Sequence, residues 1–183
     1  MNINTIRIPH GALSALLLAL VACGPGRTAD QPVEEPGAAP TEQSRSIAIR
    51  ASNGKYVCAD QAEGIARLGG LMANRESVGD WERFTLIELD STHCALRASN
   101  GKYVTAVQDG PFQAVAERDS IGDGERFELI DLANGKVAIR TAAGRYFAAE
   151  LAESAACPLC IVTDRADQGE WESFELLPAE SIR

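Results

Sequence analysis

The sequence predicts an all-β fold built from three similar units of four strands, on three observations. The octapeptide RASNGKYV occupies residues 50–57 and returns unchanged at residues 97–104, and a divergent copy, RTAAGRYF, occupies residues 140–147. Identity over eight residues within one short chain indicates an internal repeat. Around each copy, short runs of alternating apolar residues are separated by glycine-containing turns, and no helical period follows the first segment of the chain.

Each unit is expected to contain a hairpin of two strands, a loop of variable length, a third strand, a turn of constant length and a fourth strand. The hairpin turns contain Gly54, Gly101 and Gly144, which we expect at positive φ, and the Asn-Gly pair of the first two copies is a strong hairpin signal. The four strands of the successive units are expected around residues 47–49, 56–57, 71–73 and 84–86, then 94–96, 103–104, 114–116 and 127–129, then 137–139, 146–147, 161–163 and 174–176.

The spacing within the units separates framework from variable loops. Arg75 and Phe84 are nine residues apart (84 minus 75), and the same interval recurs in the other two units. The difference in length between units falls in the loop after the second strand, at residues 60–70, 107–113 and 150–160. Constant intervals are typical of framework, and variable loops are where a binding function is commonly added.

Twelve short, evenly spaced strands are compatible with a sandwich, a barrel or a propeller, but three units are too few for a propeller, which has about four or more blades. A closed threefold barrel capped by hairpins, a β-trefoil, fits best, because closure leaves few exposed strand edges. This predicted domain covers residues 46–177.

Particular residues of the first unit carry a family resemblance. Residues 47–57 (IAIRASNGKYV), followed by residues 73–75 (ANR) and 79–84 (GDWERF), resemble the fascin-like β-trefoil. That family includes the actin-bundling fascins, and similar domains are appended to bacterial polysaccharide-degrading enzymes. The resemblance implies a fold and does not reach function. The Gln-x-Trp signature of the ricin-type lectin trefoils is absent from the sequence.

The first 22 residues are predicted to be a secretory signal. Arg7 precedes an apolar run at residues 12–21, which is too short to span a bilayer. The segment LVACG at residues 20–24 resembles the lipobox of bacterial lipoproteins, which implies cleavage before Cys23 and acylation of that cysteine. In a diderm host, Gly24 after the cysteine implies an exported protein held at the outer membrane by its lipid. The alternative is an ordinary secretory signal in which Cys23 is incidental.

Residues 23–45 are predicted to be a disordered tether. Four of the eight prolines fall in this stretch and it has no aromatic residue, so it cannot bury enough apolar surface to offset the entropy of ordering. Residues 178–183 are expected to form a short C-terminal tail. The formal net charge of -9 argues against nucleic acid as a partner, and it restricts membrane contact to the lipid anchor.

The chain is not expected to be an enzyme or to hold a cofactor or metal. His93 is the only histidine after the signal, and it lies where a strand begins, so a surface position is expected and a Ser-His-Asp site is not. Pairs of carboxylates recur in every unit, whereas acid–base catalysis needs two carboxyls in unlike environments. We expect them to cap turns or to pair with the repeated arginines Arg75, Arg118 and Arg165.

The cysteines of the predicted domain are interpreted structurally. Cys157 and Cys160 lie close together in the third variable loop and are expected to form a disulfide in an exported protein. A redox Cys-x-x-Cys is disfavoured because no βαβ pattern surrounds it, and a four-cysteine zinc site is disfavoured because Cys58 and Cys94 are far apart in sequence. Cys94 replaces isoleucine and valine of the other units, so we expect it in the core.

The repeated aromatic residues are expected to pack in the core and the hairpin cap. Phe112 lies outside the repeated pattern, in the shortest variable loop, beside Gln108, Asp109 and Gln113. These four residues are the candidate ligand-binding residues. The predicted function is a non-catalytic, membrane-tethered and monomeric binding module for a polysaccharide or surface glycan. The alternative is a structural lipoprotein that binds an envelope protein, and actin cross-linking is disfavoured by the acidic charge.

Overall fold

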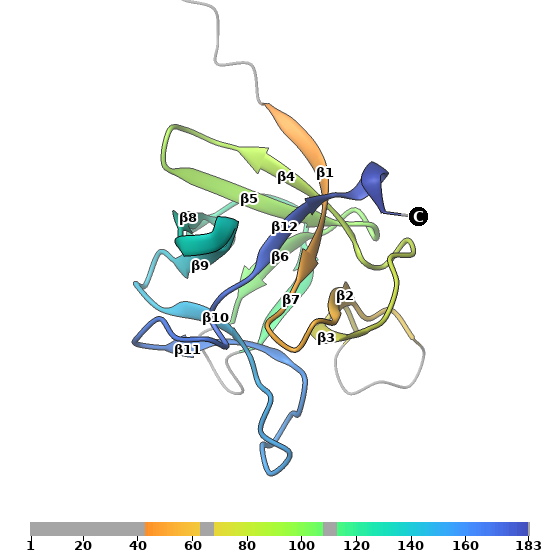
Figure 1. Cartoon of the computed structure of the whole chain (residues 1–183). Helices are drawn as coiled ribbons and strands as arrows, with labels where there is room; N and C mark the ends of the chain where they lie inside the picture. Colours follow the sequence, from red (N-terminus) through yellow and green to blue (C-terminus); the bar gives the residue numbers. More distant parts are fainter. Residues whose placement is uncertain (1–42, 63–67, 108–112, 183) are drawn as a thin grey trace, which may run out of the picture. The chain divides into compact units, whose positions relative to one another are not determined.

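The computed structural model describes residues 43–62, 68–107 and 113–182, all within one of the two units into which the chain divides, residues 39–183 (Figure 1). The expectation of an all-β domain is confirmed, and each of the twelve expected strands is present. No helix in the described part of the chain is long and apolar enough to cross a membrane. The strands are β1 (Ser44–Arg50), β2 (Tyr56–Ala59), β3 (Leu71–Arg75), β4 (Arg83–Glu88), β5 (His93–Ala98), β6 (Tyr103–Ala106), β7 (Ala114–Arg118), β8 (Phe127–Asp131), β9 (Val137–Thr141), β10 (Tyr146–Ala149), β11 (Ile161–Arg165) and β12 (Glu175–Pro178), with short 3-10 helices at Asp123–Glu125, Ala133–Gly135 and Ala179–Ser181.

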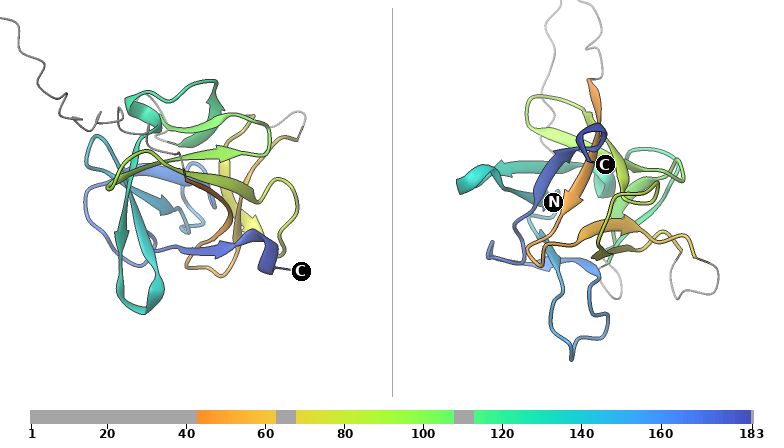
Figure 2. Two further views of the ribbon diagram at one scale, coloured as in Figure 1. Left: turned by 90° about the horizontal axis from the view of Figure 1, so that it is seen from above. Right: turned by 45° about the vertical axis from the view of Figure 1, so that its right-hand side comes forward.

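Six of these strands are joined in series by antiparallel pairing. Strand β1 pairs with both β4 and β12, β4 pairs with β5, β5 with β8, and β8 with β9. In Figure 2, β1 and β12 run side by side although they come from opposite ends of the described chain. An isolated bridge joins Val137 of β9 to Phe174, just before β12, with each N–H donating to the other carbonyl at 2.8 Å.

The other six strands form three hairpins with the same register. Tyr56 lies opposite Arg75, Tyr103 opposite Arg118 and Tyr146 opposite Arg165, and an irregularity follows the tyrosine each time. Isolated bridges connect the hairpins to one another, at Gly70 with Val115, Met72 with Cys160 and Gln113 with Val162. The glycines of the preceding turns have the expected positive φ, at 79° for Gly54, 79° for Gly101 and 76° for Gly144.

The core is centred on the phenylalanine at the start of the fourth strand of each unit, within one residue of the first residue of that strand. Phe84, Phe127 and Phe174 are each at most 1% exposed, as expected for repeated core aromatics. The rings of Phe127 and Phe147 meet edge to face, with centroids 5.0 Å apart. Cys94 is 4% exposed and joins the same cluster, which confirms its expected core position.

The thiol of Cys94 is expected to make the domain less stable at high pH. Burial, reinforced by the carboxylate of Glu88, raises the pKa of Cys94 to about 12, from an ordinary value of 9.0. The folded pKa lies above the unfolded pKa, so the contribution of the thiol is complete below pH 9.0 and is lost as the pH rises towards about 12. Within this window the free energy of unfolding should fall more steeply in the wild type than in Cys94→Ala, by up to about 1.4 kcal/mol per pH unit.

Urea denaturation of both proteins at several pH values across this window measures the difference. Cys94→Ala removes the titrating group and leaves every other titrating residue in place, so the difference between the two slopes isolates the thiol. Parallel curves for the two proteins would contradict the prediction.

Candidate functional site

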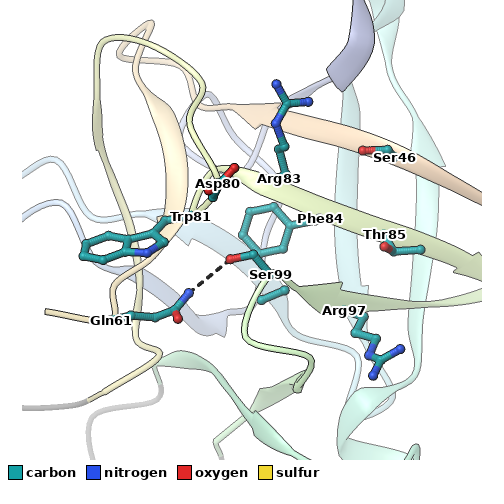
Figure 3. Close-up of a pocket in the computed structure, with 10 residues that line it drawn as sticks. Ser46, Gln61, Asp80, Trp81, Arg83, Phe84, Thr85, Arg97 and Ser99 are labelled. Atoms are coloured by element: carbon teal, nitrogen blue, oxygen red, sulfur yellow. Dashed lines mark hydrogen bonds between the residues drawn. The ribbon is translucent and has the colours of Figure 1, made fainter.

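A polar pocket of about 420 Å³ lies between residues of the first and second sequence units (Figure 3). Its walls come from β1, the loop after β2, the turn into β4 with β4 itself, and the end of β5. It combines the half-buried ring of Trp81 and the buried ring of Phe84 with hydroxyl, amide, carboxylate and guanidinium groups. We call it the Trp81 pocket, and it is lined by Ser46, Gln61, Asp80, Trp81, Arg83, Phe84, Thr85, Arg97, Ala98 and Ser99.

The turn that carries Trp81 is fixed by a buried carboxylate. Glu82 is 5% exposed, and its Oε2 accepts the backbone N–H of Gly79 at 2.7 Å. Its Oε1 lies 3.4 Å from Nε of Arg75, and the guanidinium of Arg75 stacks over the half-buried ring of Trp81, 5.6 Å from the ring centroid. Cation–π contact of this kind restrains the ring. Trp81 is therefore held in place before any ligand arrives.

The same carboxylate arrangement occurs in the other two units. Glu125 accepts the N–H of Gly122, and Glu172 accepts the N–H of Gly169, both at 2.7 Å. Glu125 lies 4.0 Å from Arg118, and Glu172 lies 3.9 Å from Arg165. The expectation that the repeated carboxylates cap turns or pair with the arginines is confirmed for Glu82, Glu125 and Glu172, each of which does both.

Two further contacts organise the pocket. The side-chain amide of Gln61 donates to the hydroxyl of Ser99 at 3.1 Å, which connects the first variable loop to the turn after β5, as Figure 3 shows. On the opposite wall, Nη1 of Arg83 donates to the carbonyl of Ala179 at 3.1 Å. The two contacts fix the side chains of Gln61, Ser99 and Arg83, all of which line the pocket.

A smaller pocket of about 180 Å³ occupies the equivalent place one unit further along the chain. His93, Arg126, Glu128 and Arg140 line it where the Trp81 pocket has Ser46, Arg83, Thr85 and Arg97. Gly124 stands at the position of Trp81, so this second pocket has no large aromatic side chain. The Trp81 pocket is the better equipped of the two for binding.

Of the four predicted ligand-binding residues, the structure describes Gln113, which does not line this pocket. Gln108, Asp109 and Phe112 lie outside the described residues, as does the predicted lipid attachment residue Cys23. Gln113 is 8% exposed, and its amide donates to Sγ of Cys160 at 3.3 Å, so its side chain faces the interior.

The remaining sequence candidates occupy structural positions. Cys157 and Cys160 are joined by a disulfide across a Cα separation of 5.6 Å. Nδ1 of His93 lies 3.0 Å from both carboxylate oxygens of Asp90 at the exposed start of β5, which confirms the expected surface position. The described residues include no group of three or more His, Cys, Asp or Glu side chains placed to hold a metal ion.

Sequence reasoning missed Trp81 because it treated every repeated aromatic as packing. One signal was present: the second unit has Gly124 at the same position, so the framework does not require an aromatic residue there. Trp171, the third residue of the set, packs against the small buried cluster that includes Cys160. Gln61 lies in the first variable loop, residues 60–70, but its contact with Ser99 has no sequence signature.

Comparison with known proteins identifies a family and a fold. Residues 50–158 match the family described as "Domain of unknown function (DUF7910)". None of the curated proteins compared with the chain matches it.

Solved structures are similar at low sequence identity. The designed three-fold symmetric protein ThreeFoil aligns with a TM-score of 0.62 at 18% identity, over 72% of this chain and 97% of its own. The BEL β-trefoil aligns with a TM-score of 0.59 at 14% identity, over 80% of this chain and 98% of its own. SeviL, solved bound to the asialo-GM1 saccharide, aligns with a TM-score of 0.56 at 13% identity, over 75% of this chain and 99% of its own. Likeness at such identities shows that the chain shares the fold of β-trefoil proteins, and nothing more.

Proposed function

This chain belongs to the DUF7910 family of domains of unknown function, so the family does not indicate an activity. From the site, we propose that the protein is a non-catalytic module that binds a glycan in the Trp81 pocket. The observation that carries the proposal is the ring of Trp81, held by Arg75 beside Gln61, Asp80 and Ser99. The similarity to SeviL, whose structure contains a saccharide, supports the same class of ligand.

The chemistry of the pocket suits a sugar. A sugar ring has apolar C–H faces, which pack on an aromatic ring, and a rim of hydroxyl groups, which both donate and accept hydrogen bonds. Asp80 supplies acceptors, Arg83 and Arg97 supply donors, and Gln61 and Ser99 supply both. Binding sites of this kind combine an apolar surface with a few positioned polar groups.

We also infer the closure of the barrel and its threefold character. The series β12, β1, β4, β5, β8 and β9 ends on the two 2.8 Å hydrogen bonds between Val137 and Phe174, which bring β9 next to β12. The equal registers of the three hairpins support three equivalent units. In this proposal the barrel is that of a fascin-like trefoil, because residues 47–57 and 79–84 carry that resemblance.

The setting of the domain is a proposal of the same kind. The lipobox-like segment around Cys23 supports an exported lipoprotein, and the proline-rich stretch after it supports a tether that holds the domain away from the membrane. A glycan-binding domain at the cell envelope would meet polysaccharides at its own surface or in its surroundings.

The test is Trp81→Ala in the full chain. A glycan array with neutral and acidic oligosaccharides identifies a bound probe, and calorimetric titration of that probe measures the dissociation constant. We expect Trp81→Ala to weaken binding by a factor of about 30 or more, which corresponds to about 2 kcal/mol for a central aromatic contact.

Trp171→Ala is the matched control, because it removes the same side chain from the equivalent turn of the third unit. Binding by this variant should equal that of the wild type. Absence of binding to every glycan of the array, or unchanged binding by a folded Trp81→Ala protein, would contradict the proposed function. Capture of an envelope protein without any glycan dependence would favour the protein-interaction alternative instead.

A further inference from the structure

We propose that the Trp81 pocket selects a glycan with a carboxylate group, such as a uronic acid, and that Arg97 binds this carboxylate. The inference rests on the proposed function of the pocket and adds the chemical class of its ligand. It comes from three arginines of this chain that occupy equivalent positions, of which two face a carboxylate and Arg97 does not.

The three arginines lie in equivalent cross-strand pairs. Arg50 lies opposite Glu175 of β12, Arg140 lies opposite Glu128 of β8, and Arg97 lies opposite Thr85 of β4. Residues directly opposite each other on antiparallel strands are close enough for their side chains to interact. In each of the three units, the fold therefore places an arginine beside one side chain of the neighbouring strand.

In two of the three pairs that neighbour is a carboxylate, and an ion pair forms. Nη2 of Arg50 lies 2.5 Å from Oε2 of Glu175, and Nη1 of Arg140 lies 3.5 Å from Oε2 of Glu128. In the third pair, Thr85 stands where glutamate stands elsewhere, and Arg97 has no carboxylate within ion-pair distance among residues 43–62, 68–107 and 113–182. This pair without a carboxylate lies at the Trp81 pocket, which both Thr85 and Arg97 line.

Arg97 is nevertheless held in place, by a hydrogen bond of its own and by a ring contact that it shares with its equivalent in the next unit. Its Nε donates to the carbonyl of Gly101 at 2.8 Å, and its guanidinium lies 5.7 Å from the ring centroid of Tyr103. The guanidinium of Arg140 lies 5.9 Å from the ring centroid of Tyr146. The position is thus arranged to receive a carboxylate that the chain itself does not provide.

A carboxylate is the anion best matched to this position. The planar fork of a guanidinium fits the two oxygens of a carboxylate, and the equivalent arginines already bind one. The charged residues of the pocket are Asp80, Arg83 and Arg97, which sum to +1 (two minus one) in a chain of formal net charge -9. A sugar ring on Trp81 with its carboxylate on Arg97 would leave Asp80 to accept from hydroxyl groups.

The decisive variant is Thr85→Glu, which supplies internally the carboxylate that the other two pairs contain. The probes are a glucuronate-containing oligosaccharide, the same compound with its carboxyl groups methyl-esterified, and a sulfated oligosaccharide without uronic acid. We expect the wild type to bind the acid more tightly than its ester, by about tenfold or more, because hydrogen bonds to a charged group are stronger than neutral ones.

Thr85→Glu should bind the acid no more tightly than the ester, because its own carboxylate occupies Arg97. Thr85→Gln is the matched control, which adds a side chain of similar size without charge and should keep the preference for the acid. The folded state of Thr85→Glu is checked by thermal unfolding, and Arg97→Ala provides a second variant in which the preference should be lost.

The results separate this inference from the proposed function. Equal binding of acid and ester by the wild type, a retained preference in Thr85→Glu and Arg97→Ala, or tighter binding of the sulfated probe would each overturn the assignment of a carboxylate. In these cases Trp81-dependent binding of a neutral glycan would still support the proposed function. If no glycan binds at all, both are overturned.

Discussion

Phe127→Ala is expected to lower the free energy of unfolding by about 3–5 kcal/mol, the range for removing a large side chain from a packed core. Phe127 is 0% exposed, so the whole ring would leave a cavity. Its edge-to-face contact with Phe147, at 5.0 Å between centroids, adds about 0.5–1.5 kcal/mol beyond area burial. A domain with a total stability of about 5–15 kcal/mol would lose a large part of it.

Two comparisons make this prediction specific. Phe84→Ala removes a ring that is 1% exposed from the equivalent position, but no paired ring is observed for Phe84 in the described residues. Its effect should therefore be smaller by about 0.5–1.5 kcal/mol. Leu68→Ala changes a side chain that is 64% exposed and should alter stability by less than about 0.5 kcal/mol. Urea denaturation of the three variants measures these values, and an equal loss in Phe84→Ala and Phe127→Ala would contradict the role of the aromatic pair.

Gly69→Ala is expected to lower the free energy of unfolding by about 2–5 kcal/mol, through two separate effects. Gly69 has φ of +78°, a left-handed conformation that costs a residue with a Cβ about 1–2 kcal/mol. A Cβ on Gly69 would also lie 2.5 Å from the carbonyl oxygen of Ala116, which is backbone and cannot rotate away. Crowding of this kind costs about 1–3 kcal/mol. The crowding occurs because the carbonyl of Gly69 accepts the N–H of Ala116 at 2.8 Å, which holds the two segments together.

Gly54→Ala separates the two effects. Gly54 has φ of +79°, but a Cβ added there meets nothing within 4 Å, so only the conformational cost of about 1–2 kcal/mol applies. Leu159 shows that a residue with a side chain can adopt this region of φ, at +67°. Positive φ alone is therefore tolerated, and the close approach to Ala116 accounts for the larger expected loss. Equal losses in the two glycine variants, measured as shifts in denaturation midpoint at constant m-value, would contradict this explanation.

The framework could be predicted from the sequence because its signals are local and occur three times. The Asn-Gly turn at Gly54 and the alternation before it identify a hairpin without reference to the rest of the chain. The equal interval from Arg75 to Phe84 in all units fixed where the fourth strand begins. The structure places strands and positive-φ glycines at those positions.

The candidate site could not be predicted, because its contacts cross from one unit to another. Gln61 and Ser99 are 38 residues apart and meet only after the first and second units have packed together. Trp81 also recurs as Trp171 in the third unit, and a residue that recurs in this way is typical of framework. The useful information was in the departures from the repeat: Gly124 in place of tryptophan, and Thr85 in place of glutamate.

The pairing of β1 with β12 affects how the chain reaches its folded state during synthesis. Ile47 lies opposite Pro178, which follows it by 131 residues (178 minus 47), so β1 leaves the ribosome long before this partner exists. One hydrogen-bonding edge of β1 remains open in the nascent chain until almost the whole domain has been made. Contacts of such long sequence separation are associated with slow folding, and an open strand edge invites pairing with other chains. The last strand of this domain therefore also protects the first.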